Sequence, residues 1–150
     1  MIKGLYETHL NVSNLESSVE FYTQKLGLEL ASIDQERRIA FLWIGDRLQN
    51  MLGLWERPEK IVQMHFAFEC DPKWVLDHSV PHLKSLGLTP YNFLKDGSEQ
   101  PMVFVWMPAI AIYFKDPDDH VLEYIGVLDG KPDPAGGVLS FDDWLKTQGS

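Results

Sequence analysis

The chain has 150 residues, 45% of them hydrophobic, which is long enough to bury a core as one compact unit or as two small halves. Its net charge of -9, with 13 scattered Lys and Arg, argues against nucleic acid as a partner because phosphate backbones would be repelled. No apolar run reaches about 20 residues, residues 1–5 lack the apolar stretch and small-residue cleavage site of a signal peptide, and Cys70 is the one cysteine. We therefore expect a cytoplasmic protein without membrane contact.

Apolar and polar side chains alternate over residues 6–12, which predicts a half-buried strand. The polar face of this strand carries Glu7, His9 and Asn11. Side chains two residues apart on a strand share a face, so Glu7 and His9 are expected to point the same way.

A helix follows this first strand. Ser13 and Glu16 fit a capping box, and apolar side chains recur at helical spacing up to Gly27, which predicts a helix over residues 14–26. Three short β-prone runs come next, over residues 28–33, 38–44 and 51–55. The first part of the chain therefore predicts the order β-α-β-β-β.

The same order recurs in the second half of the chain. Strands are predicted over residues 62–70 and 88–94, on either side of a helix that starts at Pro72 and ends at Gly87. Two further strands, over residues 109–115 and 120–127, meet at a turn that reads Asp116-Pro117-Asp118-Asp119.

Two segments fall outside this repeat. The apolar run 102–107 predicts an additional strand or the wall of a pocket. Residues 129–137 have the composition of a linker, and residues 140–146 predict a short helix. We therefore expect a C-terminal tail over residues 129–150 that packs loosely or covers a sheet edge.

Two segments carry the signature of a known family. The opening segment reads THLNVSNLESSVEFY and ends in KLGL, and the closing segment, residues 112–124, reads IYFKDPDDHVLEY. Together they resemble the vicinal oxygen chelate superfamily of glyoxalase, dioxygenase and bleomycin-resistance proteins. The resemblance implies an α+β domain over residues 1–128, in which two β-α-β-β-β modules (residues 1–58 and 60–128) form a half-open barrel.

The resemblance also implies metal ligands on the first strand of each half and on the last strand. His65 and Glu123 occupy two of these positions. The position equivalent to His65 in the first half is Glu7, as the internal repeat also indicates. His9 shares the face of Glu7 and imidazole is a good ligand, so both residues stay candidates.

Such a ligand set leaves open positions on a divalent ion of zinc, nickel, manganese or iron, where two neighbouring substrate oxygens can chelate. The implied protein is an enzyme for a small molecule with vicinal oxygens, acting as lyase, isomerase, dioxygenase or transferase. Glu123 and Glu7 are its candidate catalytic carboxylates. Trp55, Trp106 and Tyr113 are the candidates for lining the substrate pocket. We expect a homodimer because open sheet edges need covering.

The alternative is a metal-free protein that resembles bleomycin-resistance proteins and holds a cationic drug in an acidic, aromatic-lined groove. His65 and Glu123 discriminate the two functions, because a drug-binding protein needs no metal ligands. Residues 50–54 contain no match for the fourth carboxylate of glyoxalases, which argues against a lactoylglutathione lyase. Only Tyr113 matches the pocket of fosfomycin-modifying relatives, which argues against that activity as well.

Overall fold

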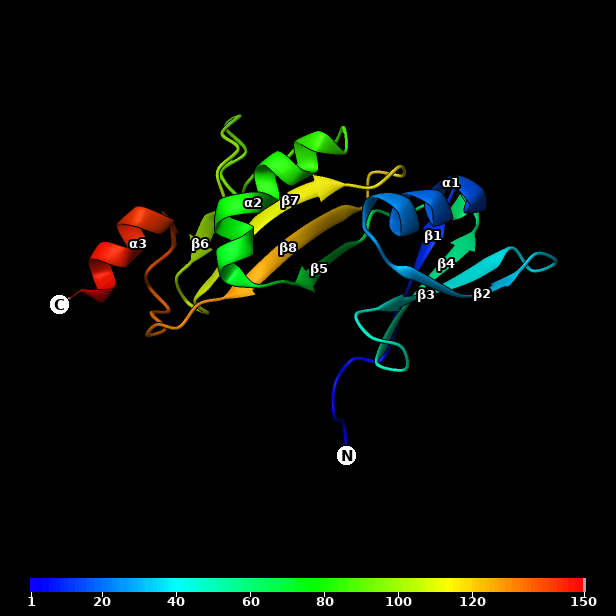
Figure 1. Cartoon of the computed structure of the whole chain (residues 1–150), viewed down its shortest axis with the longest axis horizontal. Helices are drawn as coiled ribbons and strands as arrows, with labels where there is room; N and C mark the ends of the chain where they lie inside the picture. Colours follow the sequence, from blue (N-terminus) through cyan, green and yellow to red (C-terminus); the bar gives the residue numbers. More distant parts are fainter. Residues whose placement is uncertain (150) are drawn as a thin grey trace. The chain divides into compact units, whose positions relative to one another are not determined.

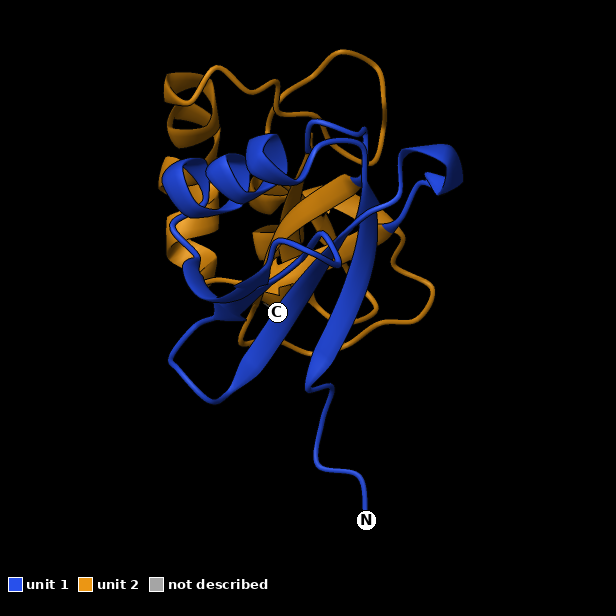
Figure 2. Cartoon of the chain, turned by 90° about the vertical axis from the view of Figure 1, so that its right-hand side faces the viewer, with its two compact units in different colours: residues 1–64, 116–120 blue, residues 65–115, 121–150 orange. Residues whose placement is uncertain are grey.

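Two β-sheets, each with helices across one face, make up the computed structural model, which describes residues 1–149 (Figure 1). The chain divides into two compact units, shown in different colours in Figure 2. Unit 1 consists of residues 1–64 and 116–120, and unit 2 of residues 65–115 and the described residues from 121 onward. No helix among residues 1–149 is long and apolar enough to cross a membrane.

Unit 1 is built on a four-stranded sheet with the strand order β1-β4-β3-β2. Strand β1 runs parallel to β4, and the other neighbours are antiparallel. The strands are β1 (Glu7–Val12), β2 (Glu29–Asp34), β3 (Ile39–Ile44) and β4 (Asn50–Glu56). All four predicted strands are confirmed, with ends that differ by one residue at most.

One helical stretch crosses this sheet, as the sequence predicts. It begins as α1 (Leu15–Glu20) and continues as a turn of π-helix, η1 (Phe21–Lys25), before Gly27 adopts a left-handed φ of 77°. Its apolar face closes the core of unit 1, which contains the buried residues Leu10, Val12, Leu15, Phe21, Tyr22, Leu42, Leu52 and Leu54.

The predicted capping box at the start of this helix is wrong. Asn14 is the cap, and its Oδ1 accepts a hydrogen bond from Ser17 N at 2.9 Å. The backbone N–H of Ser13 donates instead to Asp118 Oδ2 at 3.0 Å, and Glu16 pairs with Arg38. A long-range contact has therefore drawn Ser13 away from the role that its local sequence favours.

Unit 2 is built on a five-stranded sheet with the order β5-β8-β7-β6-β9. Strand β5 runs parallel to β8, and the other neighbours are antiparallel. The strands are β5 (His65–Glu69), β6 (Met102–Phe104), β7 (Ala109–Lys115), β8 (Val121–Val127) and β9 (Val138–Ser140).

Helix α2 (Pro72–Ser85) lies across one face of this sheet (Figure 1). Asp71 caps it by accepting a hydrogen bond from Trp74 N at 2.9 Å, and Pro72 is its first residue, as predicted. Gly126 on β8 allows the helix to approach closely, because a Cβ there would lie 2.4 Å from Pro72 Cα. The core between helix and sheet contains the buried residues Val75, Leu83, Ile110, Ile112, Phe114 and Leu122.

The predicted strand over residues 88–94 is wrong. Only Tyr91 pairs with the sheet, through an isolated bridge to Tyr113. Pro90 has no backbone N–H to donate to a neighbouring strand. The Asn92 side chain forms hydrogen bonds with backbone groups of Leu94 and Gln100 in the same loop. The strand that takes this place in the β-α-β-β-β order is β6. It comes from the apolar run 102–107, which the sequence predicts as an additional strand or a pocket wall.

The C-terminal segment completes unit 2. Strand β9 pairs with β6 and so covers the edge of the sheet. Helix α3 (Phe141–Gln148) follows, with Ser140 Oγ accepting a hydrogen bond from Asp143 N at 3.1 Å. Trp144 is its buried side chain.

The turn between β7 and β8 belongs to unit 1, where His120 anchors it. His120 is fully buried, its Nδ1 accepts from Met64 N at 3.0 Å, and its Nε2 donates to Asn11 O at 2.8 Å. Asp116, in the same turn, accepts a hydrogen bond from the Tyr22 hydroxyl at 2.7 Å. These bonds hold the turn in a defined conformation within unit 1.

Candidate functional site

His65 and Glu123 lie on neighbouring parallel strands of unit 2. The register pairs Ala67 of β5 with Glu123 of β8. His65 precedes Ala67 by two residues and therefore projects from the same face of the sheet as Ala67 and Glu123. His65 Nε2 donates to Glu123 Oε1 at 2.9 Å. Glu123 is only 5% exposed, whereas the His65 side chain is 52% exposed. The pair therefore combines a buried carboxylate with an imidazole that a ligand can reach.

Tyr113 completes the polar cluster around this pair. It stands opposite Glu123 on β7, and its ring centroid lies 5.7 Å from that of His65. Burial raises the pKa of Glu123, although the hydrogen bond from His65 opposes this shift. Burial, together with the negative charge of Glu123, raises the pKa of Tyr113 to about 12. The Tyr113 hydroxyl is therefore a hydrogen-bond donor at neutral pH.

His65 and Tyr113 also line a cavity of about 360 Å³, a size that suits a small molecule. The walls come from β5, β7, β8 and the loop that follows α2. The lining residues are His65, Tyr91, Phe93, Lys95, Tyr113 and Val121.

Glu7 and His9 lie on β1 in unit 1, where His9 Nε2 is 3.7 Å from Glu7 Oε1. The imidazole packs against Phe41 and Trp55, with ring centroids 5.7 and 5.3 Å away. Gly53, opposite His9 on β4, leaves room for this ring, because a Cβ there would lie 2.9 Å from His9 Nδ1. His9 thus lies in an aromatic cradle and has a carboxylate beside it.

The three predicted pocket aromatics have separate places. Tyr113 lines the cavity beside His65. Trp55 packs on His9, with the Arg57 guanidinium 5.4 Å from its ring centroid. Trp106 lies in the turn after β6, is 58% exposed and is outside the lining of that cavity.

The four predicted metal ligands form two pairs, one in each unit. Among residues 1–149, no three or more His, Cys, Asp or Glu side chains gather closely enough to hold a metal ion. The 2.9 Å between His65 Nε2 and Glu123 Oε1 nevertheless fits two neighbouring ligands at right angles. Such ligands lie about 3 Å apart on an ion with bonds of about 2.1 Å. This pair therefore fits part of a ligand set.

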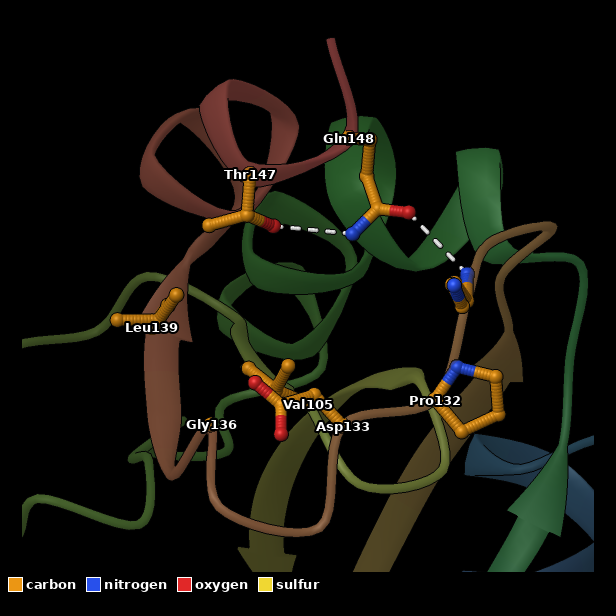
Figure 3. Close-up of a pocket in the computed structure, with 8 residues that line it drawn as sticks. Val105, Pro132, Asp133, Gly136, Leu139, Thr147 and Gln148 are labelled. Atoms are coloured by element: carbon orange, nitrogen blue, oxygen red, sulfur yellow. Dashed lines mark hydrogen bonds between the residues drawn. The ribbon is translucent and has the colours of Figure 1, made fainter. Parts of the chain in front are cut away.

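A second cavity, of about 500 Å³, lies beside the C-terminal segment (Figure 3). Gln148 crosses one side of it, donating from Nε2 to Thr147 Oγ1 at 2.9 Å and accepting at Oε1 from Lys131 N at 3.1 Å. The lining contains none of the predicted ligands, so this cavity is separate from the candidate site.

Three cavity residues, Tyr91, Phe93 and Lys95, were missed as site residues by the sequence interpretation. Two of them lie in the segment wrongly predicted as a strand. Pro90 and the Asp96-Gly97 turn are the signals that could have identified this segment as a loop.

Comparison with known proteins identifies the family. The model of the glyoxalase/bleomycin resistance protein/dioxygenase superfamily matches residues 4–124. Among solved structures, an integron cassette protein from the mobile metagenome of the Halifax Harbour sewage outfall is 35% identical, with a TM-score of 0.72 over 84% of this chain and 100% of that chain.

Two structures of lower identity share the fold. Lactoylglutathione lyase from Agrobacterium tumefaciens is 20% identical, with a TM-score of 0.66 over 83% of this chain and 94% of that chain. The fosfomycin resistance protein FosX from Listeria monocytogenes, solved with Mn(II) and sulfate, is 21% identical, with a TM-score of 0.62 over 85% of this chain and 93% of that chain. The predicted α+β fold class is thus confirmed, and the chain belongs to the glyoxalase/bleomycin resistance protein/dioxygenase superfamily.

Proposed function

We propose that this protein is a metal-dependent enzyme acting on a small molecule with two neighbouring oxygen atoms. One observation carries the proposal: the buried Glu123 carboxylate lies 2.9 Å from the His65 imidazole, which lines a cavity of about 360 Å³. Buried titratable groups with perturbed pKa values in a cavity are typical of sites of chemistry.

In this proposal His65 and Glu123 would hold a divalent ion, and Glu7 and His9 are the candidates on β1 whose contribution is to be tested by substitution. Imidazole and carboxylate ligands together suit zinc, nickel, manganese and iron. FosX was solved with Mn(II), which makes manganese a good first ion to test. Held by these residues, such an ion would supply Lewis-acid polarisation of the two substrate oxygens.

The protein's own groups would orient the substrate and move protons. Burial raises the pKa of Glu123, which makes its carboxylate more basic and suits it to both coordination and proton transfer. The Tyr113 hydroxyl would donate a hydrogen bond to a substrate oxygen. Glu7 is the second carboxylate that we propose for catalysis.

The second candidate function is metal-free binding of a cationic drug. The net charge of -9 and the aromatic cradle of His9, Phe41 and Trp55 favour it. The cavity beside His65 argues against it, because its lining includes Lys95 and, within the described residues, no carboxylate.

Elemental analysis of untagged protein, followed by calorimetric titration with zinc, manganese, nickel and iron(II), tests the metal proposal. We expect about one ion per chain, bound at a site that His65→Ala abolishes. His78→Ala removes an exposed histidine of α2 and should bind like the native protein. If no ion binds the native protein more tightly than the His65→Ala variant, the metal enzyme is rejected and drug binding takes its place.

A further inference from the structure

Lys95 reaches the cavity from a loop that is held in a defined shape. Asn92, 1% exposed, anchors this loop by donating from Nδ2 to Ser98 Oγ at 2.8 Å and to Gln100 O at 2.9 Å. Its Oδ1 accepts from Leu94 N at 3.0 Å, and its backbone carbonyl accepts from Lys95 N at 3.1 Å. The position of Lys95 is therefore set by a buried side chain.

The backbone of Lys95 is unusual. Its φ of 52° lies in the left-handed region, which residues other than glycine seldom adopt. Arg38, Leu48 and Asp119 share this conformation, which persists only where the surrounding structure imposes it. Here the imposed conformation puts a cationic residue in the wall of the cavity.

The charge of Lys95 is not neutralised within its loop. Glu99 is paired with Lys84, and Asp96 Oδ1 accepts from Ser98 N at 2.9 Å. The Lys95 ammonium has no ion-pair partner among the residues that the structure describes. In a chain with a net charge of -9, an unpaired cation in a cavity wall without carboxylates favours an anion.

Aromatic rings supply the rest of the recognition surface. Tyr91 and Tyr113 are joined by backbone hydrogen bonds of 3.0 and 2.8 Å, and their ring centroids lie 5.5 Å apart. Phe93 adds a third ring to the lining. Within residues 1–149 neither tyrosine hydroxyl has a hydrogen-bond partner, so both can donate to a ligand.

We propose that the substrate is a small organic anion with a flat apolar body, whose oxyanion is bound by Lys95 and whose ring lies against Tyr91 and Tyr113. This proposal rests on the proposed function, because it takes the cavity beside His65 and Glu123 as the substrate site. A charge-assisted hydrogen bond and an aromatic wall together would select an aromatic acid over its neutral amide.

The test is binding of benzoate, phenylphosphonate and neutral benzamide to the full chain, measured by NMR titration before and after EDTA treatment. We expect at least one of the two anions to bind about tenfold more tightly than benzamide, with or without metal. Which anion binds better distinguishes carboxylate from phosphonate substrates. Lys95→Met, which keeps the length of the side chain, should remove the preference, and Lys95→Arg should retain it. Lys131→Met, at the second cavity, is the matched control and should bind like the native protein.

Equal affinity for benzamide and both anions, absence of anion binding, or an unchanged preference in Lys95→Met would each overturn the proposal. The EDTA-treated sample distinguishes failure of the anion-site proposal from failure of the metal-enzyme proposal. If no metal binds but Lys95 still selects anions, the enzyme proposal falls and the anion site stands. If His65 binds metal but Lys95→Met changes nothing, the reverse holds.

Discussion

The two halves of the chain use the same strand pairing and fill it with contrasting side chains. In unit 2, Glu123 stands opposite Ala67 of β5, whereas in unit 1 Gly53 stands opposite His9 of β1. One half therefore places a carboxylate beside a small residue. The other places an imidazole over a glycine.

The neighbouring antiparallel strand repeats this contrast. Tyr113 stands opposite Glu123, and Phe41 stands opposite Gly53. Tyr113 lies 5.7 Å from the ring of His65, and Phe41 lies at the same distance from the ring of His9. The scaffold is thus repeated, but the hydroxyl and the buried carboxylate occur in unit 2 alone at these positions. The chemistry that we propose therefore depends mainly on unit 2.

Substitutions on β1 test whether unit 1 supplies a metal ligand. In Glu7→Gln and His9→Ala, we expect one variant to lose more than about tenfold in metal affinity and the other about tenfold or less, the size of an effect on a supporting residue. Calorimetric titration measures both. Small and equal losses would show that unit 1 supplies no ligand.

The sheet edges of the two halves also differ. Strand β9 covers β6 in unit 2, whereas β2 is the last strand of its sheet in unit 1, with Leu30 and Ile33 exposed. An open apolar edge favours association, so we expect a homodimer that Ile33→Lys weakens by about tenfold or more. Light scattering at micromolar concentrations measures this. A native protein that is monomeric there contradicts the expectation.

A substitution of Gly53 tests the cradle of His9. Gly53→Ala should destabilise the protein by about 1–2 kcal/mol, because the new Cβ would lie 2.9 Å from His9 Nδ1 and the ring must move. Urea unfolding measures the loss, and NMR of the His9 ring reports its displacement. Gly4→Ala, with no atom within 4 Å of the new Cβ, is the control. Equal stability of the two variants would contradict the close contact.

Unit 1 also contains an ion pair, Arg38 with Glu56, whose role is to stabilise the fold. Hydrogen bonds from Arg38 and from the Leu15 backbone N–H lower the pKa of Glu56 to about 2. A carboxylate whose pKa is lower in the folded protein than in the unfolded chain stabilises the fold at any pH above its unfolded-state pKa. This stabilisation is lost as the pH falls through the folded-state pKa. Glu56→Gln should therefore lower the melting temperature at pH 7, by a difference that shrinks between pH 4.5 and about 2. A difference that stays constant over this range would contradict the assignment.

The sequence was sufficient where local pattern and tertiary structure agree. The alternation of residues 6–12 correctly predicts strand β1, and Asp71-Pro72 correctly predicts the start of helix α2. Both signals are short-range, because they depend on burial of one face and on capping. The resemblance to the family singles out His65 and Glu123 as candidate ligands, and in the structure their side chains are hydrogen-bonded to each other.

The rest depends on contacts between residues far apart in the sequence. The bond from Ser13 to Asp118 crosses most of the chain, so the capping box could not be excluded from local sequence. Burial of Asn92 turns an apparent strand into the loop that carries Lys95. That Gly53 makes room for His9 follows only from the register of β1 and β4.

The proposed function requires that His65 and Glu123 bind a divalent ion. Crystals grown with Mn(II) and measured for anomalous scattering test it most directly, because the map locates the metal itself. We predict a peak within about 2.3 Å of both a His65 ring nitrogen and a Glu123 carboxylate oxygen. A map with no peak at these two side chains, from crystals that hold Mn(II) elsewhere or not at all, would contradict the claim.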